Sequence, residues 1–275
     1  MPDAPALNSL EMLRAFDLAT PSSVHADGRS PAGVGTATVS VVVPTRNEEQ
    51  NVEPLVAGLR GTFGDRPFEL VFVDDSSDST PERIRDLVEA GAPLRLLHRP
   101  PHARQGGLGG AVLEGFAAAD GEVIVVMDAD LQHPPQLAAK LAATVALGMA
   151  DIAVASRFAA GASARGLAGP VRHLVTAGTR RLAHVAVPRS RGIQDPLSGC
   201  FALRREVLSS GPRRSDGFKV LLDVLALGTW TTAVELPFVL GARTAGSSKA
   251  HATEGARFLR QCWRLRRSAA ASVAA

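Results

Sequence analysis

Apolar runs alternate with helical patterns through the first half of the chain. An apolar run over residues 38–44 precedes a helical pattern over 48–60, and a second apolar run over 68–75 precedes a helical pattern over 77–90. Strands that alternate with helices are typical of a parallel α/β sheet. The Val and Ile residues in these runs largely follow one another, which predicts strands covered by helices on both faces.

The same alternation continues along the chain, although the second half is less periodic. We expect further strands over 94–100, 122–130, 151–157 and 233–241, further helices over 111–119, 136–148, 171–186 and 219–227, and a loop over 189–206. Residues 1–36 are rich in Ser, Pro, Gly and Ala, which predicts a flexible extension with one short helix over 11–18. The expected organisation is this extension, one α/β domain over 37–250, and a C-terminal helix and tail over 251–275.

Composition narrows the class of protein. The chain has 275 residues, of which 45% are hydrophobic, so it can bury a full core. Its formal net charge of +3 is too weak to indicate nucleic-acid binding, although it favours anionic partners such as phosphates. The two cysteines, Cys200 and Cys262, lie far apart without metal-ligand spacing and fit a reducing cytoplasm. We find no apolar run long enough to span a membrane and no apolar secretory core, and therefore expect a protein that is neither secreted nor integral.

Three of the predicted strands end in polar clusters. These clusters read "PTRNEE" after the first strand, "DDSSD" after the second and "DADLQ" after the strand over 122–130. Ligands of open α/β sheets bind at the carboxyl ends of the strands. The sequence therefore predicts a functional site at this edge of the sheet.

Asp128 and Asp130 are separated by one residue at the end of an apolar strand. In an extended segment, side chains two apart point to the same side, so both carboxylates can approach one point. All-oxygen ligation favours Mg²⁺ or Mn²⁺ over zinc. The alternative is a turn of solvated aspartates, and the residue pair alone leaves both interpretations open. His133 could line such a site or cap the turn before Pro134.

Asp74 and Asp75 end another predicted strand. Helix capping accounts for Ser79 and Thr80 but not for this pair, and ribose or base recognition is a natural role for a carboxylate there. The glycine-rich segment 104–111 precedes a helix and could bring backbone amides near a phosphate, or could be a tight turn.

Together these pieces resemble the family-2 glycosyltransferases of the GT-A fold, and within them the polyprenol-phosphate (dolichol-phosphate) mannose synthase group. The pieces that match, in the order of the family, are "VVVPTRNEEQN", "VFVDDSSDST", "GLGGA", "VMDADLQHPP", "ASRF", "DPLSGCFALRREV", "GFKVLLD" and "GARTAGSSK". They span residues 38–250. The resemblance implies an α/β fold of the GT-A type, with a mixed and mostly parallel sheet flanked by helices in a single domain.

The resemblance also implies roles for individual residues on the donor side. It implies that a nucleotide sugar is held by Pro44, Arg46, Glu48, Asp75, Asp128, Gln132 and Arg243. Asp128 and Asp130 would hold the metal, and Lys249 would offset charge on the diphosphate. A solvated basic loop is the alternative for Arg243 and Lys249.

On the acceptor side, the resemblance implies that Arg157 and Arg172 bind a lipid phosphate. Asp195 and Ser198 match a family loop near the acceptor, although Pro196 and Gly199 could equally make that loop a structural turn. The catalytic set is then Asp130, Arg157, Asp195 and Lys249.

A polyprenyl phosphate oxygen is already anionic near neutral pH, so no strong general base is expected. Catalysis would consist of positioning and charge stabilisation, and direct displacement would invert the anomeric centre to give a β-linked product. GDP-mannose is the first choice of donor and UDP-glucose the second. A nonenzymatic nucleotide or lipid-phosphate-binding regulator is a third possibility, whereas a nucleotidyltransferase would want a glycine-rich, lysine-bearing loop after the first strand.

The C-terminal stretch combines apolar and basic residues at helical spacing. Phe258, Leu259, Cys262 and Trp263 lie among five arginines within "EGARFLRQCWRLRR". Such a helix could lie on an anionic membrane surface, or could be an ordinary surface helix that packs Trp263 on the domain. The expected location is the cytoplasmic face of a membrane, reached by this helix or through a separate membrane-anchoring protein.

Overall fold

The structure is a computed structural model that describes residues 38–162, 170–212, 214–215, 217–241 and 252–273. Seven strands form one sheet in the order β3-β2-β1-β4-β6-β5-β7. The strands are β1 (Val39–Thr45), β2 (Phe68–Asp74), β3 (Leu94–His98), β4 (Val123–Val126), β5 (Ile152–Ser156), β6 (Phe201–Arg204) and β7 (Ala233–Pro237). Only β6 runs antiparallel to its neighbours among these strands, so the predicted mixed, mostly parallel sheet is confirmed.

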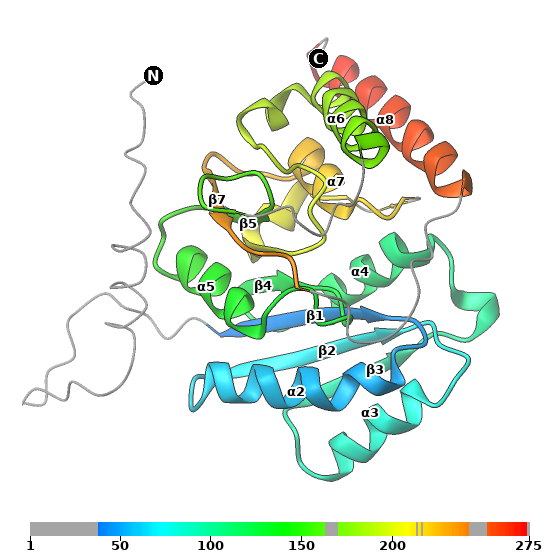
Figure 1. Ribbon diagram of the computed structural model, residues 1–275, viewed down its shortest axis with the longest axis vertical. Helices are drawn as coiled ribbons and strands as arrows, with labels where there is room; N and C mark the ends of the chain where they lie inside the picture. The colour runs from blue at the N-terminus through cyan, green and yellow to red at the C-terminus, as the bar shows by residue number, and fades with distance from the viewer. Residues whose placement is uncertain (1–37, 163–169, 213, 216, 242–251, 274–275) are drawn as a thin grey trace, which may run out of the picture.

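Helices cover both faces of the sheet (Figure 1). They are α2 (Glu49–Phe63), α3 (Thr80–Glu89), α4 (Gly107–Ala118), α5 (Pro135–Ala146), α6 (Pro170–Ala186), α7 (Val220–Leu227) and α8 (Ala252–Val273), with short 3-10 helices at Pro101–Ala103, Pro188–Gly192 and Arg205–Ser210. The predicted extension over 1–36, with its helix over 11–18, lies outside the described residues.

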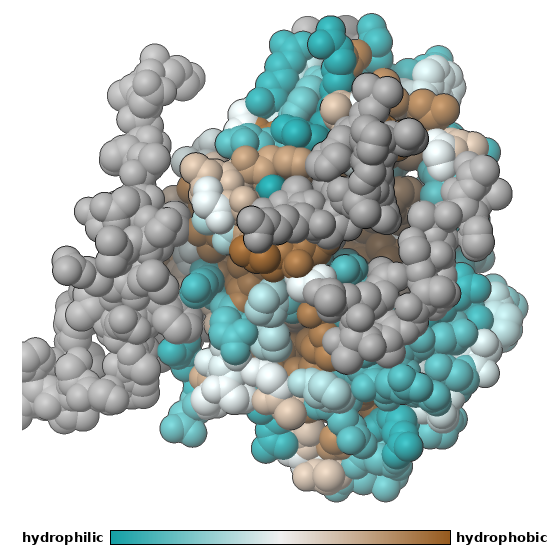
Figure 2. Space-filling view, viewed as in Figure 1, coloured by the Kyte–Doolittle hydropathy of each residue, from teal (hydrophilic) through white to brown (hydrophobic). Residues whose placement is uncertain are grey.

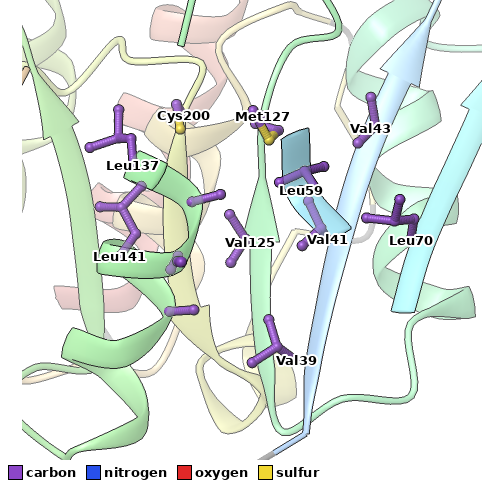
Figure 3. Packing of buried hydrophobic residues seen from close by; sticks show 14 of the residues in the cluster. Val39, Val41, Val43, Leu59, Leu70, Val125, Met127, Leu137, Leu141 and Cys200 are labelled. Atoms are coloured by element: carbon purple, nitrogen blue, oxygen red, sulfur yellow. The ribbon is translucent and has the colours of Figure 1, made fainter. Parts of the chain in front are cut away.

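The core has two halves, one on each side of the sheet. Alternate residues of a strand point to opposite faces, so Val41 and Val125 pack with α2, α3 and α5 whereas Val42 and Ile124 pack with α4 and α7. Figure 3 shows the first half, where side chains of α2 and α5 meet those of β1 and β4. This double covering explains why the strand sequences carry so few polar residues.

The element that the sequence failed to predict is β6. We expected a loop over 189–206, but residues 201–204 pair antiparallel with both β4 and β5. Four residues are too few to show a strand period, and their partners are distant in sequence. This pairing with β4 on one side and β5 on the other joins the two halves of the sheet.

Two element boundaries also differ from the prediction. β4 ends at Val126, so the expected strand over 122–130 stops before its aspartates. The glycine-rich turn proves to be the start of α4, with Gly106 and Gly107 at φ of +73° and +55°. Glycine adopts this left-handed conformation without the steric cost that a Cβ brings.

Parallel strands deliver their carboxyl ends to one edge. β1, β2, β4, β5 and β7 all end there. Because β6 runs in the opposite direction, it begins at this edge, and the loop that precedes it lies there too. The segments after these strand ends are therefore neighbours in space although they are spread through the sequence.

Candidate active site

The aspartates of the "DADLQ" turn lie at this edge, just past the end of β4. Met127 still donates its backbone N–H to Val42, after which the chain turns at Leu131, whose φ is +59°. The backbone N–H of Gln132 donates to Asp130 Oδ1 at 3.1 Å. The two carboxylates thus project from a turn rather than from the extended segment that we expected.

Gly199 packs directly against one of these carboxylates. A Cβ built on Gly199 would lie 2.8 Å from Asp128 Oδ2. Real Cβ atoms do not approach oxygen so closely, so the glycine makes room for the carboxylate. This close approach joins the "DPLSG" loop to the "DADLQ" turn.

Gln132 connects the turn to the segment that follows β7. Its side-chain nitrogen donates to the carbonyl of Gly241 at 3.2 Å, and the N–H of Gly241 donates back to the carbonyl of Gln132 at 3.0 Å. The predicted phosphate-binding residues Arg243 and Lys249 follow Gly241 but lie outside the described residues. The contact therefore places the beginning of their segment beside the turn.

Arg157 and Asp195 form a buried ion pair. The guanidinium of Arg157 donates from Nε to Asp195 Oδ2 at 2.8 Å and from Nη2 to Oδ1 at 2.9 Å, and the backbone N–H of Arg157 adds a third bond. The Asp195 side chain is 1% exposed, whereas that of Arg157 is 22% exposed. The carboxylate therefore orients Arg157, and the guanidinium keeps a face towards solvent.

The loop that carries Asp195 is held from behind by β7. Glu235 accepts the backbone N–H groups of Gln194 and Asp195 at 2.7 and 2.8 Å. Ser198 is buried, and its hydroxyl donates to the carbonyl of Cys200 and accepts the N–H of Cys200. The "DPLSG" loop is thus a tight turn, as one interpretation expected, and it also orients Arg157. Its position near an acceptor stays a prediction.

Lys219 is a site residue that sequence reasoning missed. Its Nζ donates to the carbonyl of Leu197 at 3.1 Å. Burial and, to a lesser extent, the charge of Arg157 lower the pKa of Lys219, and Asp128 and Asp195 oppose them, so that the pKa is about 8. The "GFKVLLD" piece could have singled out this lysine, but nothing local in it indicates that the side chain reaches the "DPLSG" loop.

His133 lies buried beside the same acidic residues. Burial lowers the pKa of His133, and the charges of Asp128 and Asp130 oppose that shift. Its Nδ1 has no hydrogen-bond partner among the described residues, and its ring lies 5.0 Å from that of Phe238. The imidazole is therefore neutral at pH 7 and lines the turn.

At the ends of β1 and β2, the two neighbouring aspartates have different surroundings. Asp74 is fully buried, accepts a bond from Thr45 Oγ1 at 2.8 Å, and lies 2.7 Å from His98 Nδ1. Asp75 accepts two bonds from Arg99, at 2.8 and 2.6 Å. Asp74 is therefore a structural residue that bonds the ends of β1, β2 and β3 to one another. Asp75 is held in place by the guanidinium of Arg99.

The remaining predicted donor residues within the described ranges lie at the end of β1 and in the segment after it, next to Asp75. Pro44 is half-buried near the end of β1, and Arg46 is exposed. Glu48 donates its backbone N–H to Thr80 at 2.9 Å, and its carboxylate accepts a bond from Asn51 at 2.7 Å. Arg172 lies in the first turns of α6, and its side chain is outside the described part of the structure.

The acidic turn contains a suitable but small set of metal ligands. Within the described ranges, no three His, Cys, Asp or Glu side chains gather closely enough to hold a metal ion together. Asp128, Asp130 and Gln132 offer carboxylate and amide oxygens, the ligands that Mg²⁺ and Mn²⁺ accept alongside water. The donor set therefore fits a hard divalent cation.

Comparison with known proteins gives a family and several relatives. Residues 40–211 match the model of the family described as "Glycosyl transferase family 2". A dolichol-phosphate mannosyltransferase of Pyrococcus furiosus is 38% identical over 228 residues, which are 82% of this chain and 63% of that protein. This chain thus spans less than two thirds of that relative. A dolichol-phosphate mannosyltransferase of Saccharomyces cerevisiae is 34% identical over 76% of this chain and 80% of its own length.

The solved structures support the fold. Mannosyl-3-phosphoglycerate synthase from Rubrobacter xylanophilus superposes with a TM-score of 0.60, covering 84% of this chain and 73% of its own, at 22% sequence identity. The expected GT-A type of α/β fold is confirmed.

Proposed function

The chain belongs to glycosyl transferase family 2, and from that membership we propose that it is an inverting hexosyltransferase that acts on a polyprenyl phosphate. The proposed hexose is mannose, since two relatives bear the name dolichol-phosphate mannosyltransferase. GDP-mannose is the first donor to test and UDP-glucose the second. One observation carries the proposal: an acidic turn at Asp128 and an oriented cation at Arg157 meet at one sheet edge through the "DPLSG" loop.

On the donor side, the proposed nucleotide site is the end of β1 and β2. Asp75, fixed by Arg99, supplies a carboxylate for ribose or base, and Pro44, Arg46 and Glu48 complete that side. Arg243 and Lys249 are the proposed partners of the diphosphate.

The proposed cofactor is Mg²⁺ or Mn²⁺, held by Asp128 and Asp130 with Gln132 beside them. When bound, such an ion offsets the negative charge that develops on a diphosphate leaving group. The neutral His133 adds no competing positive charge to this turn.

On the acceptor side, Arg157 would orient the lipid phosphate, with Arg172 and Ser198 nearby. An oxygen of that phosphate attacks the anomeric carbon while the bond from this carbon to the nucleoside diphosphate breaks, which inverts the centre and gives a β-linked product. The attacking oxygen is anionic, so Asp195 is not needed as a base. Its bonds to Arg157 fit a positioning role instead.

We further propose that α8 lies on the cytoplasmic face of a membrane. No described helix is long and apolar enough to cross a bilayer. Phe258, Cys262 and Leu265 of α8 pack into the core, whereas Leu259 and Trp263 are 58% and 61% exposed. Trp263 therefore does not pack on the domain, although the opposite face of α8 does.

The outer face of α8 is also basic. Arg260, Arg266 and Arg267 are exposed, and the guanidinium of Arg267 lies 4.5 Å from the centre of the Trp263 ring. A helix face that combines exposed apolar side chains with exposed arginines fits an anionic lipid surface. A separate membrane-anchoring protein is the alternative occupant of this face.

The function is tested with purified protein, a short polyprenyl phosphate, Mg²⁺ or Mn²⁺, and a panel of labelled nucleotide sugars. We expect label from GDP-mannose to enter the organic phase as an acid-labile lipid phosphate. Nucleotide binding without transfer from any donor, with membranes present, would contradict the proposal and favour a nonenzymatic regulator.

A further inference from the structure

Lys219 approaches the site from an element that contributes none of the residues discussed for catalysis. It immediately precedes α7, and its side chain crosses to the "DPLSG" loop, where Nζ lies 3.1 Å from the carbonyl oxygen of Leu197. The charges that act on it include those of Asp128, Arg157 and Asp195. Lys219 thus belongs to the same electrostatic cluster as the oriented arginine.

The position of Lys219 is fixed from both ends. Its backbone carbonyl accepts a bond from Gln261 Nε2 of α8 at 3.0 Å. Its ammonium lies 4.5 Å from the centre of the Phe218 ring. A lysine held in this way loses little further conformational entropy when it binds a ligand, so it is preorganised.

The carboxylates of Asp128, Asp195 and Glu254 act on the charge of Lys219 without an ion pair among the described residues. Asp195 is engaged by Arg157, and Lys219 forms no ion pair with any described carboxylate. An ammonium has three N–H donors, and the described residues accept one of them. Within the described ranges, two donors and one positive charge thus have no direct partner, and buried cations are stable when they are paired.

We propose that Lys219 is a second cation of the acceptor phosphate site, which it forms together with Arg157. The inference rests on the proposed transfer to a polyprenyl phosphate and adds a residue to its acceptor side. The ligand is a phosphate monoester, whose two negative charges match a guanidinium and an ammonium that reach the same "DPLSG" loop from the end of β5 and the start of α7. The lowered pKa of Lys219 agrees with a cation that awaits an anion, because a bound phosphate would raise it again.

The test compares Lys219→Gln with Lys219→Arg and with the control Lys140→Gln, which changes an exposed lysine of α5. Equilibrium binding of farnesyl phosphate and of uncharged farnesol is measured for each variant, followed by the KM of donor and acceptor. Thermal unfolding checks that each variant is folded, and Lys219→Arg keeps the charge if Lys219→Gln does not fold.

We expect Lys219→Gln to weaken binding of farnesyl phosphate, and to raise the acceptor KM, by about 10- to 100-fold, the usual effect of losing a charge-assisted hydrogen bond. Farnesol binding and the donor KM should change by less than about 2-fold, since neither depends on this charge in the proposal. Lys219→Arg should retain most of the affinity, and Lys140→Gln all of it.

Two results would overturn the inference. One is unchanged binding of farnesyl phosphate by Lys219→Gln, and the other is a rise in donor KM that equals or exceeds the rise in acceptor KM. Absence of transfer by the unmodified protein would instead contradict the proposed function, and the binding comparison would still decide whether Lys219 holds a phosphate monoester.

Discussion

Gly199 lies so close to Asp128 that a single added methyl group would press on the carboxylate, with a Cβ 2.8 Å from Oδ2. We therefore expect Gly199→Ala to displace Asp128 and to lower kcat/KM by about 100-fold, the scale of loss that follows a small misplacement in a reacting site. The measurement is steady-state transfer with the folded state checked by circular dichroism. The matched control is Gly61→Ala on α2, where a Cβ meets nothing within 4 Å. Equal losses in both variants would contradict the role given to this contact.

The ion pair of Arg157 and Asp195 makes a second prediction. Asp195→Asn removes the buried charge that the partly exposed guanidinium faces, so we expect the free energy of unfolding to fall by about 3 kcal/mol and the acceptor KM to rise. Chemical denaturation and acceptor kinetics measure the two effects. Glu82→Gln is the control, because it breaks an exposed pair with Arg85 that contributes less than about 1 kcal/mol. An Asp195→Asn variant with wild-type stability would show that the pair is not needed to hold Arg157.

The acidic turn makes a third prediction. Asp130→Asn should abolish the increase in melting temperature that GDP and Mn²⁺ together give the unmodified protein, because it replaces a charged oxygen ligand with a neutral amide. Differential scanning fluorimetry with nucleotide, metal, and both separates the contributions. An Asp130→Asn variant that kept the full shift and full transfer would disprove the metal assignment.

The two faces of α8 make a fourth prediction, because neighbouring aromatic residues point opposite ways. Trp263→Ala should leave the melting temperature nearly unchanged and reduce binding to anionic vesicles, since the ring is exposed. Phe258→Ala should lower stability by about 3 to 5 kcal/mol, because it empties a core position. Vesicle co-sedimentation and denaturation separate the two effects. Wild-type vesicle binding by Trp263→Ala would favour recruitment by another protein.

Asp151 makes the fifth prediction, on acid stability. Burial raises its pKa, but bonds from the backbone and side chains of Thr231 and Thr232 outweigh this effect and lower the pKa to about 2 from an ordinary 3.8. A lowered carboxyl pKa stabilises the fold above the unfolded value and loses that effect as pH falls through the folded value. The difference in unfolding free energy between the unmodified protein and Asp151→Asn should therefore be on the order of 1–2 kcal/mol at pH 6 and shrink between pH 4 and 2. A pH-independent difference would contradict this assignment.

The sequence predicted those parts of the fold whose signal is local. The apolar runs of β1 and β2 identify these strands, and the edge where they end follows from the parallel order. Ser79 and Thr80 mark the start of α3, although the Ser79 side chain makes none of the capping bonds that we expected. By contrast, β6 depends on partners far along the chain. The residues that pair with β6 on both sides belong to β4 and β5, so its own four residues do not show that it is a strand.

The same distinction holds for the site. Asp128, Asp130 and Arg157 follow strands, so their common edge could be predicted. The role of Lys219 depends on how α7 packs against the "DPLSG" loop, and the bidentate partner of Asp75 depends on where β3 places Arg99. Such contacts between distant segments leave no pattern in a single sequence.

The reversed strand also has a consequence for how the protein is made. In the described sheet, β4 and β5 are joined through β6, so a growing chain can pair β1 to β4 early while β5 waits for residues that have not yet been synthesised. Asp128 follows β4 and Arg157 follows β5, and each therefore reaches its final neighbour only when β6 enters the gap. The contacts of Asp128 with Gly199 and of Arg157 with Asp195 therefore cannot form until residues 195–204 have left the ribosome, so the chain order alone makes them late events in synthesis.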